Sequence, residues 1–176
     1  MTARKAHGFA LIDLIFVCGV IGILVSIAMP SLFTAKSSAG AASAIGSMRT
    51  IGSAQLTYAL TCGAGFYAPS LSTLGTPPPG SNAPFIGGGL GSANTVTKAA
   101  YIIQMTATPF AGSPVSCNGA AAGDGGQGYK AAADPNLAGN PRFFVTNANS
   151  VIFEHTSTLF AVMPESGEPP VGHILR

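Results

Sequence analysis

The chain opens with a short polar stretch and then becomes almost wholly apolar. Residues 1–8 read MTARKAHG, and residues 9–33 read FALIDLIFVCGVIGILVSIAMPSLF. About 20 apolar residues cross the hydrocarbon core of a bilayer, so the second stretch is long enough for one membrane-spanning helix. Because Arg4 and Lys5 precede it, the positive-inside rule predicts a cytoplasmic N-terminus, with the rest of the chain beyond the membrane.

Residues 34–62 carry apolar and small side chains at helical spacing. These side chains recur at steps of three and four residues, at Ala41, Ile45, Met48, Gly52, Leu56 and Ala59. No proline interrupts the segment, and Gly63 suits a left-handed cap at its end. We therefore predict one helix over 9–62, roughly 80 Å long at about 1.5 Å per residue. Its first half, 9–33, is the membrane half, and its second half, 34–62, is amphipathic.

Beyond residue 62 the pattern changes to loops and strands. Proline and glycine are frequent in 63–97, which predicts a long irregular loop with one short helical turn at 70–74. Segments typical of strands follow at 99–108, 128–133, 141–146, 151–155 and, as a short last strand, 158–163. The tetrad 147–150 suits a hairpin turn, and the tail from Pro164 is expected to be exposed.

Together these elements predict an α+β fold. One long N-terminal helix packs on a small antiparallel sheet of three or four strands. Residues 63–176 form the irregular loop and the sheet of a globular head. The total of 176 residues suits one small domain plus an anchor.

The distribution of charge argues against a nucleic-acid partner. The formal net charge is +2, and Arg4 and Lys5 supply the excess, because six basic residues face six acidic ones once residues 1–8 are set aside. The rest of the chain therefore has no basic footprint for nucleic acid, and no run of like charge indicates a polybasic membrane patch.

Three cysteines divide between the two parts of the chain. Cys18 lies in the apolar run, whereas Cys62 and Cys117 lie in the part expected outside the cytoplasm. An oxidising compartment favours a disulfide between Cys62 and Cys117, and the alternative is two buried thiols. Closing a loop of this size stabilises the fold by about 4 kcal/mol in the entropic model. Cys18 is expected to stay free.

Two other kinds of N-terminal signal compete with a permanent anchor. An ordinary secretory signal peptide is disfavoured because the apolar run is long and Asp13 lies near its start. A lipoprotein signal ending at Cys18 is disfavoured because bulky side chains precede that cysteine where small ones are needed. These are Ile15, Phe16 and Val17.

The N-terminal segment resembles the prepilin signature of type IV pilins and type II secretion pseudopilins. The matching residues are Lys5, Gly8, Phe9, Ala10, Leu11, Ile12, Asp13, Leu14 and, further along, Pro30. The resemblance implies a leader at 1–8, cleavage between Gly8 and Phe9 by a prepilin peptidase, and methylation of the new amino group on Phe9. It also implies a pilin-like fold and a single-pass protein of the bacterial inner membrane, with its head in the periplasm or, in the filament, outside the cell.

The resemblance assigns roles to two residues within the apolar run. In this family the acid at the place of Asp13 pairs with the N-terminal amine of a neighbouring subunit during assembly, although that acid is usually Glu. The alternative for Asp13 is a first-turn acid that interacts with the helix dipole. Pro30 lacks an N–H and leaves the Ser26 carbonyl without its helical partner, which implies a local kink. The alternative for Pro30 is an ordinary end of the membrane span.

Signals for catalysis or cofactor binding are weak. Residues 123–128 match G-x-G-x-x-G, but no strand leads into them and no helix follows, so we expect a flexible loop. The downstream acids are scattered, at Asp124, Asp134, Glu154, Glu165 and Glu168. They do not show the spacing of a calcium-binding loop. Calcium binding is left open, and no other metal or cofactor is expected. We expect no catalytic residues and no enzymatic activity.

The expected function is that of a structural subunit of a type II secretion pseudopilus or a type IV pilus. The resemblance implies four kinds of partner: prepilin peptidase, other copies of the chain or related pilins, an inner-membrane assembly platform, and membrane lipid before assembly. The first alternative is a membrane-tethered or tip minor pilin that acts as a binding or adhesion module. The second is a secreted enzyme with a cleaved signal peptide.

Overall fold

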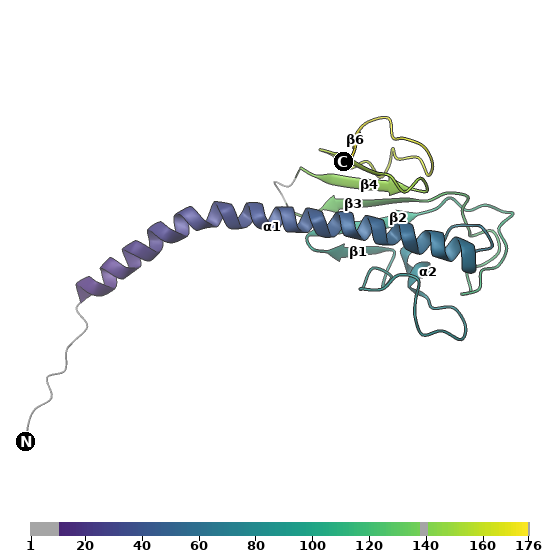
Figure 1. Cartoon of the computed structure of the whole chain (residues 1–176), viewed down its shortest axis with the longest axis horizontal. Coiled ribbons are helices and arrows are strands. Elements are labelled where there is room, and N and C mark those ends of the chain that lie inside the picture. Colours follow the sequence, from purple (N-terminus) through teal and green to yellow (C-terminus); the bar gives the residue numbers. More distant parts are fainter. Residues whose placement is uncertain (1–10, 138–140, 176) are drawn as a thin grey trace, which may run out of the picture. The chain divides into compact units, whose positions relative to one another are not determined.

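The computed structural model of the chain describes residues 11–137 and 141–175 (Figure 1). The predicted cleavage and methylation residues, Gly8 and Phe9, lie outside the described residues. The elements in chain order are α1 (Leu11–Thr61), α2 (Leu71–Gly75), β1 (Thr95–Lys98), β2 (Tyr101–Thr106), β3 (Lys130–Pro135), β4 (Phe143–Asn147), β5 (Ile152–His155) and β6 (His173–Ile174). The predicted α+β class, with one long N-terminal helix on an antiparallel sheet, is confirmed.

The chain divides within α1, after Ser38, into two compact units. We call residues 11–38 the apolar segment, and we call the unit that starts at Ala39 the head. The head contains the second part of α1, the short helix α2 and all six strands.

Helix α1 ends at Thr61, within one residue of the predicted end. The left-handed residues that follow are Ala64 and Gly65, with φ of 50° and 93°, so the prediction that Gly63 takes this conformation is wrong. Gly63 is instead required by close packing, because a Cβ there would collide with the carbonyl oxygen of Phe66. The predicted turn of helix at 70–74 is confirmed as α2, and the Ser70 hydroxyl caps it by accepting a 3.3 Å hydrogen bond from the Thr73 amide.

The sheet has six strands in the order β1-β2-β3-β4-β5-β6, more than the three or four predicted. The segment predicted as a strand, 99–108, begins with a turn, and the additional strand β1 lies before it, in residues that were predicted mostly as loop. Ala99 and Ala100 both have positive φ, 49° and 65°, and join β1 to β2 as a two-residue hairpin. Two-residue hairpins of this kind usually carry Asn-Gly or Asp-Gly. Because both turn residues are alanines, the sequence carries no signal for this turn.

The segment predicted as a last strand, 158–163, is a turn and not a strand. Its apolar side chains Leu159 and Met163 cover a small second core on Ala132, Val145 and Phe153. These three strand residues alternate with the ones that face α1, so the turn covers the opposite face of the sheet. Burial of Leu159 and Met163 explains the apolar pattern without a strand.

The tail after Pro164 is mostly exposed, as predicted, but it is tied to the sheet. The Asn147 side-chain amide donates hydrogen bonds of 3.1 Å to the Pro164 carbonyl and 2.7 Å to the Gly167 carbonyl. Further along, β6 pairs with β5 and supplies the sixth strand. The predicted hairpin at 147–150 is confirmed between β4 and β5.

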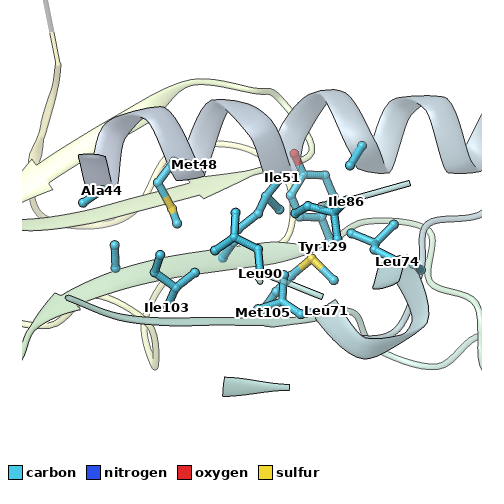
Figure 2. Packing of buried hydrophobic residues seen from close by; sticks show 14 of the residues in the cluster. Ala44, Met48, Ile51, Leu71, Leu74, Ile86, Leu90, Ile103, Met105 and Tyr129 are labelled. Atoms are coloured by element: carbon cyan, nitrogen blue, oxygen red, sulfur yellow. The ribbon is translucent and has the colours of Figure 1, made fainter. Parts of the chain in front are cut away.

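The main core lies between α1 and one face of the sheet (Figure 2). Met48 and Ile51 of α1 point toward Ile103 of β2, and Leu71 and Leu74 of α2 close one end of this core. The strand β3 contributes two short side chains to this core, Ala131 and Ala133, which are both fully buried. Its third alanine, Ala132, belongs to the small core on the opposite face of the sheet.

The buried face of α1 differs from the predicted stripe. Met48 and Ala59 are buried as predicted, whereas Leu56 is 55% exposed, so its place in the stripe is wrong. Gln55 occupies the interior instead, with 0% exposure. Its side chain accepts a 2.8 Å hydrogen bond from the Ala68 amide and donates a 3.0 Å bond to the Ala68 carbonyl, which satisfies both polar atoms.

A disulfide joins Cys62, at the end of α1, to Cys117, as predicted. The two residues are 55 positions apart in sequence, and the Cys117 amide also donates a 3.1 Å hydrogen bond to the Cys62 carbonyl. Cys18 is free and exposed in the apolar segment.

Replacing the turn Ala99-Ala100 with Asn-Gly should stabilise the head. A non-glycine residue in the left-handed region costs about 1–2 kcal/mol, so the double substitution should raise the free energy of unfolding by about 1–2 kcal/mol. The measurement is thermal unfolding of the full-length chain in detergent, with Ala93→Gly as the control because Ala93 is exposed and its φ is not positive. An unchanged or lower melting temperature for Ala99→Asn/Ala100→Gly would contradict the turn assignment.

Removing the disulfide should destabilise the head strongly. Because the closed loop spans 55 residues, the double variant Cys62→Ala/Cys117→Ala should lose about 4 kcal/mol of unfolding free energy. Chemical denaturation in detergent measures the loss, and Cys18→Ser is the control with no expected change. Mass spectrometry of the unreduced protein checks the pairing, and recovery of Cys62 and Cys117 as alkylatable thiols would refute it.

Candidate functional site

The apolar segment presents an uninterrupted apolar surface to its surroundings. Its large apolar side chains from Leu11 to Phe33 are all exposed, and no residue of the segment is buried within the chain. By length and composition, α1 is the one helix among the described residues that could cross a membrane. Each Å² of apolar surface left in water costs about 25 cal/mol, so exposure of this surface to water is unfavourable.

Asp13 is the only charged residue between positions 11 and 35. It lies in the first turn of α1, its side chain is exposed, and it makes no ion pair with any described residue. An ionised carboxylate in an apolar membrane segment is costly and is a functional candidate by default. Within the described chain, therefore, the charge of Asp13 has no compensating partner.

Pro30 lies inside α1, and the residues on both sides of it are helical. The Thr34 hydroxyl donates a 3.1 Å hydrogen bond to the Pro30 carbonyl, and the Ser26 hydroxyl donates a 2.8 Å bond to the Ile23 carbonyl. The kink that the resemblance implies at Pro30 stays a prediction.

Seven of the eleven serine and threonine side chains of α1 donate to a main-chain carbonyl three or four residues earlier: Ser26, Thr34, Ser47, Thr50, Ser53, Thr57 and Thr61. These side chains have therefore satisfied their donors without water. Two of the seven, Ser26 and Thr34, lie in the apolar segment, where this bond lowers the polar cost of an apolar environment.

Four of the five acids of the head each accept a hydrogen bond from another residue of the chain: Asp124, Asp134, Glu154 and Glu165. Glu154 accepts 2.6 Å and 3.0 Å hydrogen bonds from the Arg142 guanidinium, and this bidentate contact lowers the pKa of the Glu154 carboxyl. Burial raises the pKa of Asp134, and a 2.7 Å bond from the Thr158 hydroxyl partly offsets that rise. Among the described residues no three His, Cys, Asp or Glu side chains gather around a common point. The calcium site that the sequence left open therefore gains no cluster of acids.

The loop that matches G-x-G-x-x-G is packed into the head and is not the flexible loop that was expected. Gly125, Gly126 and Gly128 are buried. Gly126 exchanges main-chain hydrogen bonds of 2.8 Å and 3.0 Å with Tyr67, and a Cβ at Gly126 would approach the Ala107 Cβ to 2.6 Å. These glycines serve close packing, and no helix follows to bind a phosphate.

An open surface hollow lies beside β4, β5 and β6. It is lined by Arg142, Glu154, His173, Ile174 and Leu175. In this hollow, Arg142 and Glu154 form an ion pair with each other. The arrangement offers no nucleophile next to a base, so the hollow gives no support to the secreted-enzyme alternative.

Comparison of the chain with protein-family models, curated proteins and solved structures finds no match. Function therefore has to be inferred from the apolar segment and the head themselves. The two features that bear on it are an apolar segment that the described part of the chain does not bury and, in its first turn, a carboxylate without an ion pair to any described residue.

Proposed function

We propose that this protein is a structural subunit of a type II secretion pseudopilus or a type IV pilus, anchored and assembled through α1. The observation that carries the proposal is the change of environment along one helix. Its apolar segment is exposed on all sides, whereas its continuation from Ala39 packs one face on the sheet. A chain built in this way presents a helix for other molecules to surround and a folded head that remains outside the membrane.

Processing follows from the order of the segments. Gly8 has no side chain, so the main chain before Phe9 can enter a narrow peptidase site in an extended form. Cleavage between these residues precedes the apolar run, so the anchor remains attached to the head. This is the reverse of an ordinary signal peptide, whose apolar core is removed.

Cleavage also creates the partner that Asp13 lacks. Before cleavage, the nitrogen of Phe9 belongs to a peptide bond and carries no charge. Afterwards it is an amine, and its pairing with Asp13 of a neighbouring copy removes the cost that each charge bears alone in an apolar environment. Because the pair requires the new amine, polymerisation depends on processing by the peptidase.

The remaining partners and the location follow from the same scheme. Arg4 and Lys5 favour a cytoplasmic N-terminus, which exposes the leader to a prepilin peptidase of the inner membrane. Lipid surrounds the apolar segment before assembly, and an assembly platform in the inner membrane transfers it to the growing filament. The head is then periplasmic or, in an extended pilus, extracellular, where the Cys62–Cys117 disulfide is stable.

Substitution of Gly8 by a bulky residue should block maturation. Gly8→Val places a branched side chain in the scissile segment, so the unprocessed and larger form should accumulate on a gel. Ala6→Val is the matched control, because it adds comparable bulk two residues before the scissile bond. Mass spectrometry of the parent should give Phe9 as the mature N-terminus, and normal processing of Gly8→Val would count against the proposal.

Substitution of Asp13 should separate processing from assembly. Asp13→Ala should still insert and be cleaved, but its incorporation into filaments should fall sharply, because loss of one partner of a buried charge pair costs about 3–5 kcal/mol. Asp13→Glu should assemble at least as well as the parent, and Leu14→Ala controls for side-chain loss without loss of charge. The readout is the fraction of processed protein in sheared or pelleted filaments. If Asp13→Ala assembles at the parental level, Asp13 has no role in assembly and is only a first-turn acid that interacts with the helix dipole.

A further inference from the structure

A narrow groove runs along the head between α1 and the β4–β5 hairpin. Met48, Arg49 and Gly52 line it from α1, and Ser150 and Ile152 line it from the hairpin. The volume of the groove is about 130 Å³. Because a water molecule takes up about 30 Å³ in the liquid, the groove has room for a few waters or for a ligand of a few non-hydrogen atoms.

Gly52 leaves space for a ligand atom at the inner side of the groove. A Cβ built on Gly52 would lie 3.3 Å from the Tyr129 hydroxyl oxygen and 3.7 Å from the Ser150 hydroxyl oxygen. Because residue 52 is a glycine, no side chain of its own fills that space. A ligand oxygen at the same place would lie near hydrogen-bonding distance from both hydroxyl groups.

The Tyr129 hydroxyl is a buried donor with no hydrogen-bond partner among the described residues. Tyr129 is 1% exposed, and its oxygen points toward α1 (Figure 2). Burial raises the pKa of Tyr129 to about 12, a rise that the nearby Ser150 hydroxyl partly offsets, so the group stays protonated at neutral pH. Buried polar groups are nearly always hydrogen-bonded, so an acceptor supplied from outside the chain would satisfy this donor.

Arg49 supplies the only ionisable group among the residues that line the groove. Its guanidinium is exposed and forms no ion pair with any described residue. Two other hydroxyls of the groove are already used, because Ser53 donates a 3.0 Å hydrogen bond to the Thr50 carbonyl and Thr146 donates a 2.9 Å bond to the Val151 carbonyl. The charge that the groove offers to a ligand is therefore a single positive one.

These donors and walls fit a small carboxylate. A guanidinium holds a planar carboxylate through two parallel N–H bonds, and Met48 and Ile152 favour a short aliphatic chain over a fully hydrated inorganic anion. We propose that the groove is a binding site for a small aliphatic monocarboxylate, held by Arg49 at its exposed end and by the hydroxyls of Tyr129 and Ser150 beside Gly52. The inference goes beyond the proposed function and does not depend on it.

The chain's own Glu168 is the competing carboxylate. Gly167 is hydrogen-bonded to the side chains of Asn147 and Asn149, so Glu168 lies beside the same turn that supplies Ser150. Glu168 is nevertheless exposed and forms no ion pair with any described residue. The groove is therefore open to an external carboxylate, and removal of the Glu168 charge is part of the test.

Two glycine substitutions in α1 test the position of the site. The full-length chain in detergent is titrated with isotope-labelled propionate at constant ionic strength, and binding is followed by broadening of the propionate signal in NMR spectra. Gly52→Ala places a Cβ in the space beside the two hydroxyls and should abolish binding. Gly46→Ala is the matched control, because Gly46 is exposed on the same helix and a Cβ there meets nothing within 4 Å. Equal binding by the two variants would overturn the inference.

Single removal of each donor tests the groove without filling it. Arg49→Gln should weaken propionate binding by about tenfold or more, because a charge-assisted hydrogen bond is lost, and Lys98→Gln is the control with no expected change. Tyr129→Phe removes one neutral donor and should weaken binding by about threefold to tenfold. Thermal unfolding of each variant in detergent separates loss of binding from loss of folding. Parental affinity in a folded Arg49→Gln or Tyr129→Phe variant would contradict the proposed site.

Glu168→Gln distinguishes an external carboxylate from the chain's own tail. This variant should bind propionate at least as tightly as the parent, because it removes a negative charge beside the groove. If the parent binds no propionate and Glu168→Gln does, the chain's own carboxylate occupies the groove and the proposal is wrong. If neither binds propionate, the groove holds only water and the proposal is equally wrong.

Discussion

The packing of the second part of α1 against the sheet is the contact on which the rest of the structure depends. Its facing surfaces combine large side chains, such as Met48 and Ile51 of α1 and Ile103 of β2, with small ones. Ala131 and Ala133 of β3 are fully buried in this core, and at Gly40 a Cβ would lie 2.8 Å from the Ala99 carbonyl oxygen. Larger residues at these three places would collide with their neighbours, because the core is closely packed.

The loop that follows the helix depends on that contact in turn. Residues 63–97 hold little regular structure. Gln55 of α1 exchanges two hydrogen bonds with the main chain of Ala68, near the start of this segment. The disulfide joins Cys62, just after α1, to Cys117 beyond the segment. A buried amide is tolerated there because both of its polar atoms are satisfied. The head can thus keep a glycine- and proline-rich loop without losing a single packed core.

Charged residues are scarce in this chain, so the surroundings of each can be described individually. Only three charged residues lie on α1, namely Asp13, Lys36 and Arg49, and none of them forms an ion pair with a described residue. In the head, by contrast, the Arg142–Glu154 pair and the bonds to Asp134 and Glu165 hold the acids in place. The charges of α1 are exposed and are not paired within the part of the chain that the structure describes.

The sequence by itself determined the features that repeat or that follow from local chemistry. The apolar run, the extent of α1, the α2 turn and the β4–β5 hairpin were all predicted, because periodicity, capping and turn residues act over a few positions. The disulfide was also predicted, because Cys62 and Cys117 are the two cysteines outside the apolar run. Of the nine residues that carry the resemblance to prepilins, Lys5, Gly8, Phe9 and Ala10 lie outside the described residues, so the proposed cleavage site is known from the sequence alone.

The tertiary structure decided what depends on contacts between distant residues. Two alanines adopt the left-handed turn between β1 and β2 because the paired strands impose it, although their identity favours no such turn. Leu159 and Met163 lie in a turn because the far face of the sheet offers them burial. Gln55 is buried and Leu56 exposed because Ala68 provides the matching hydrogen bonds. A small groove lined by Met48 and Arg49 of α1 and by Thr146 and Ile152 of the β4–β5 hairpin exists only because these elements pack together. Its two walls are about one hundred positions apart in the sequence, and local pattern carries no information over such distances.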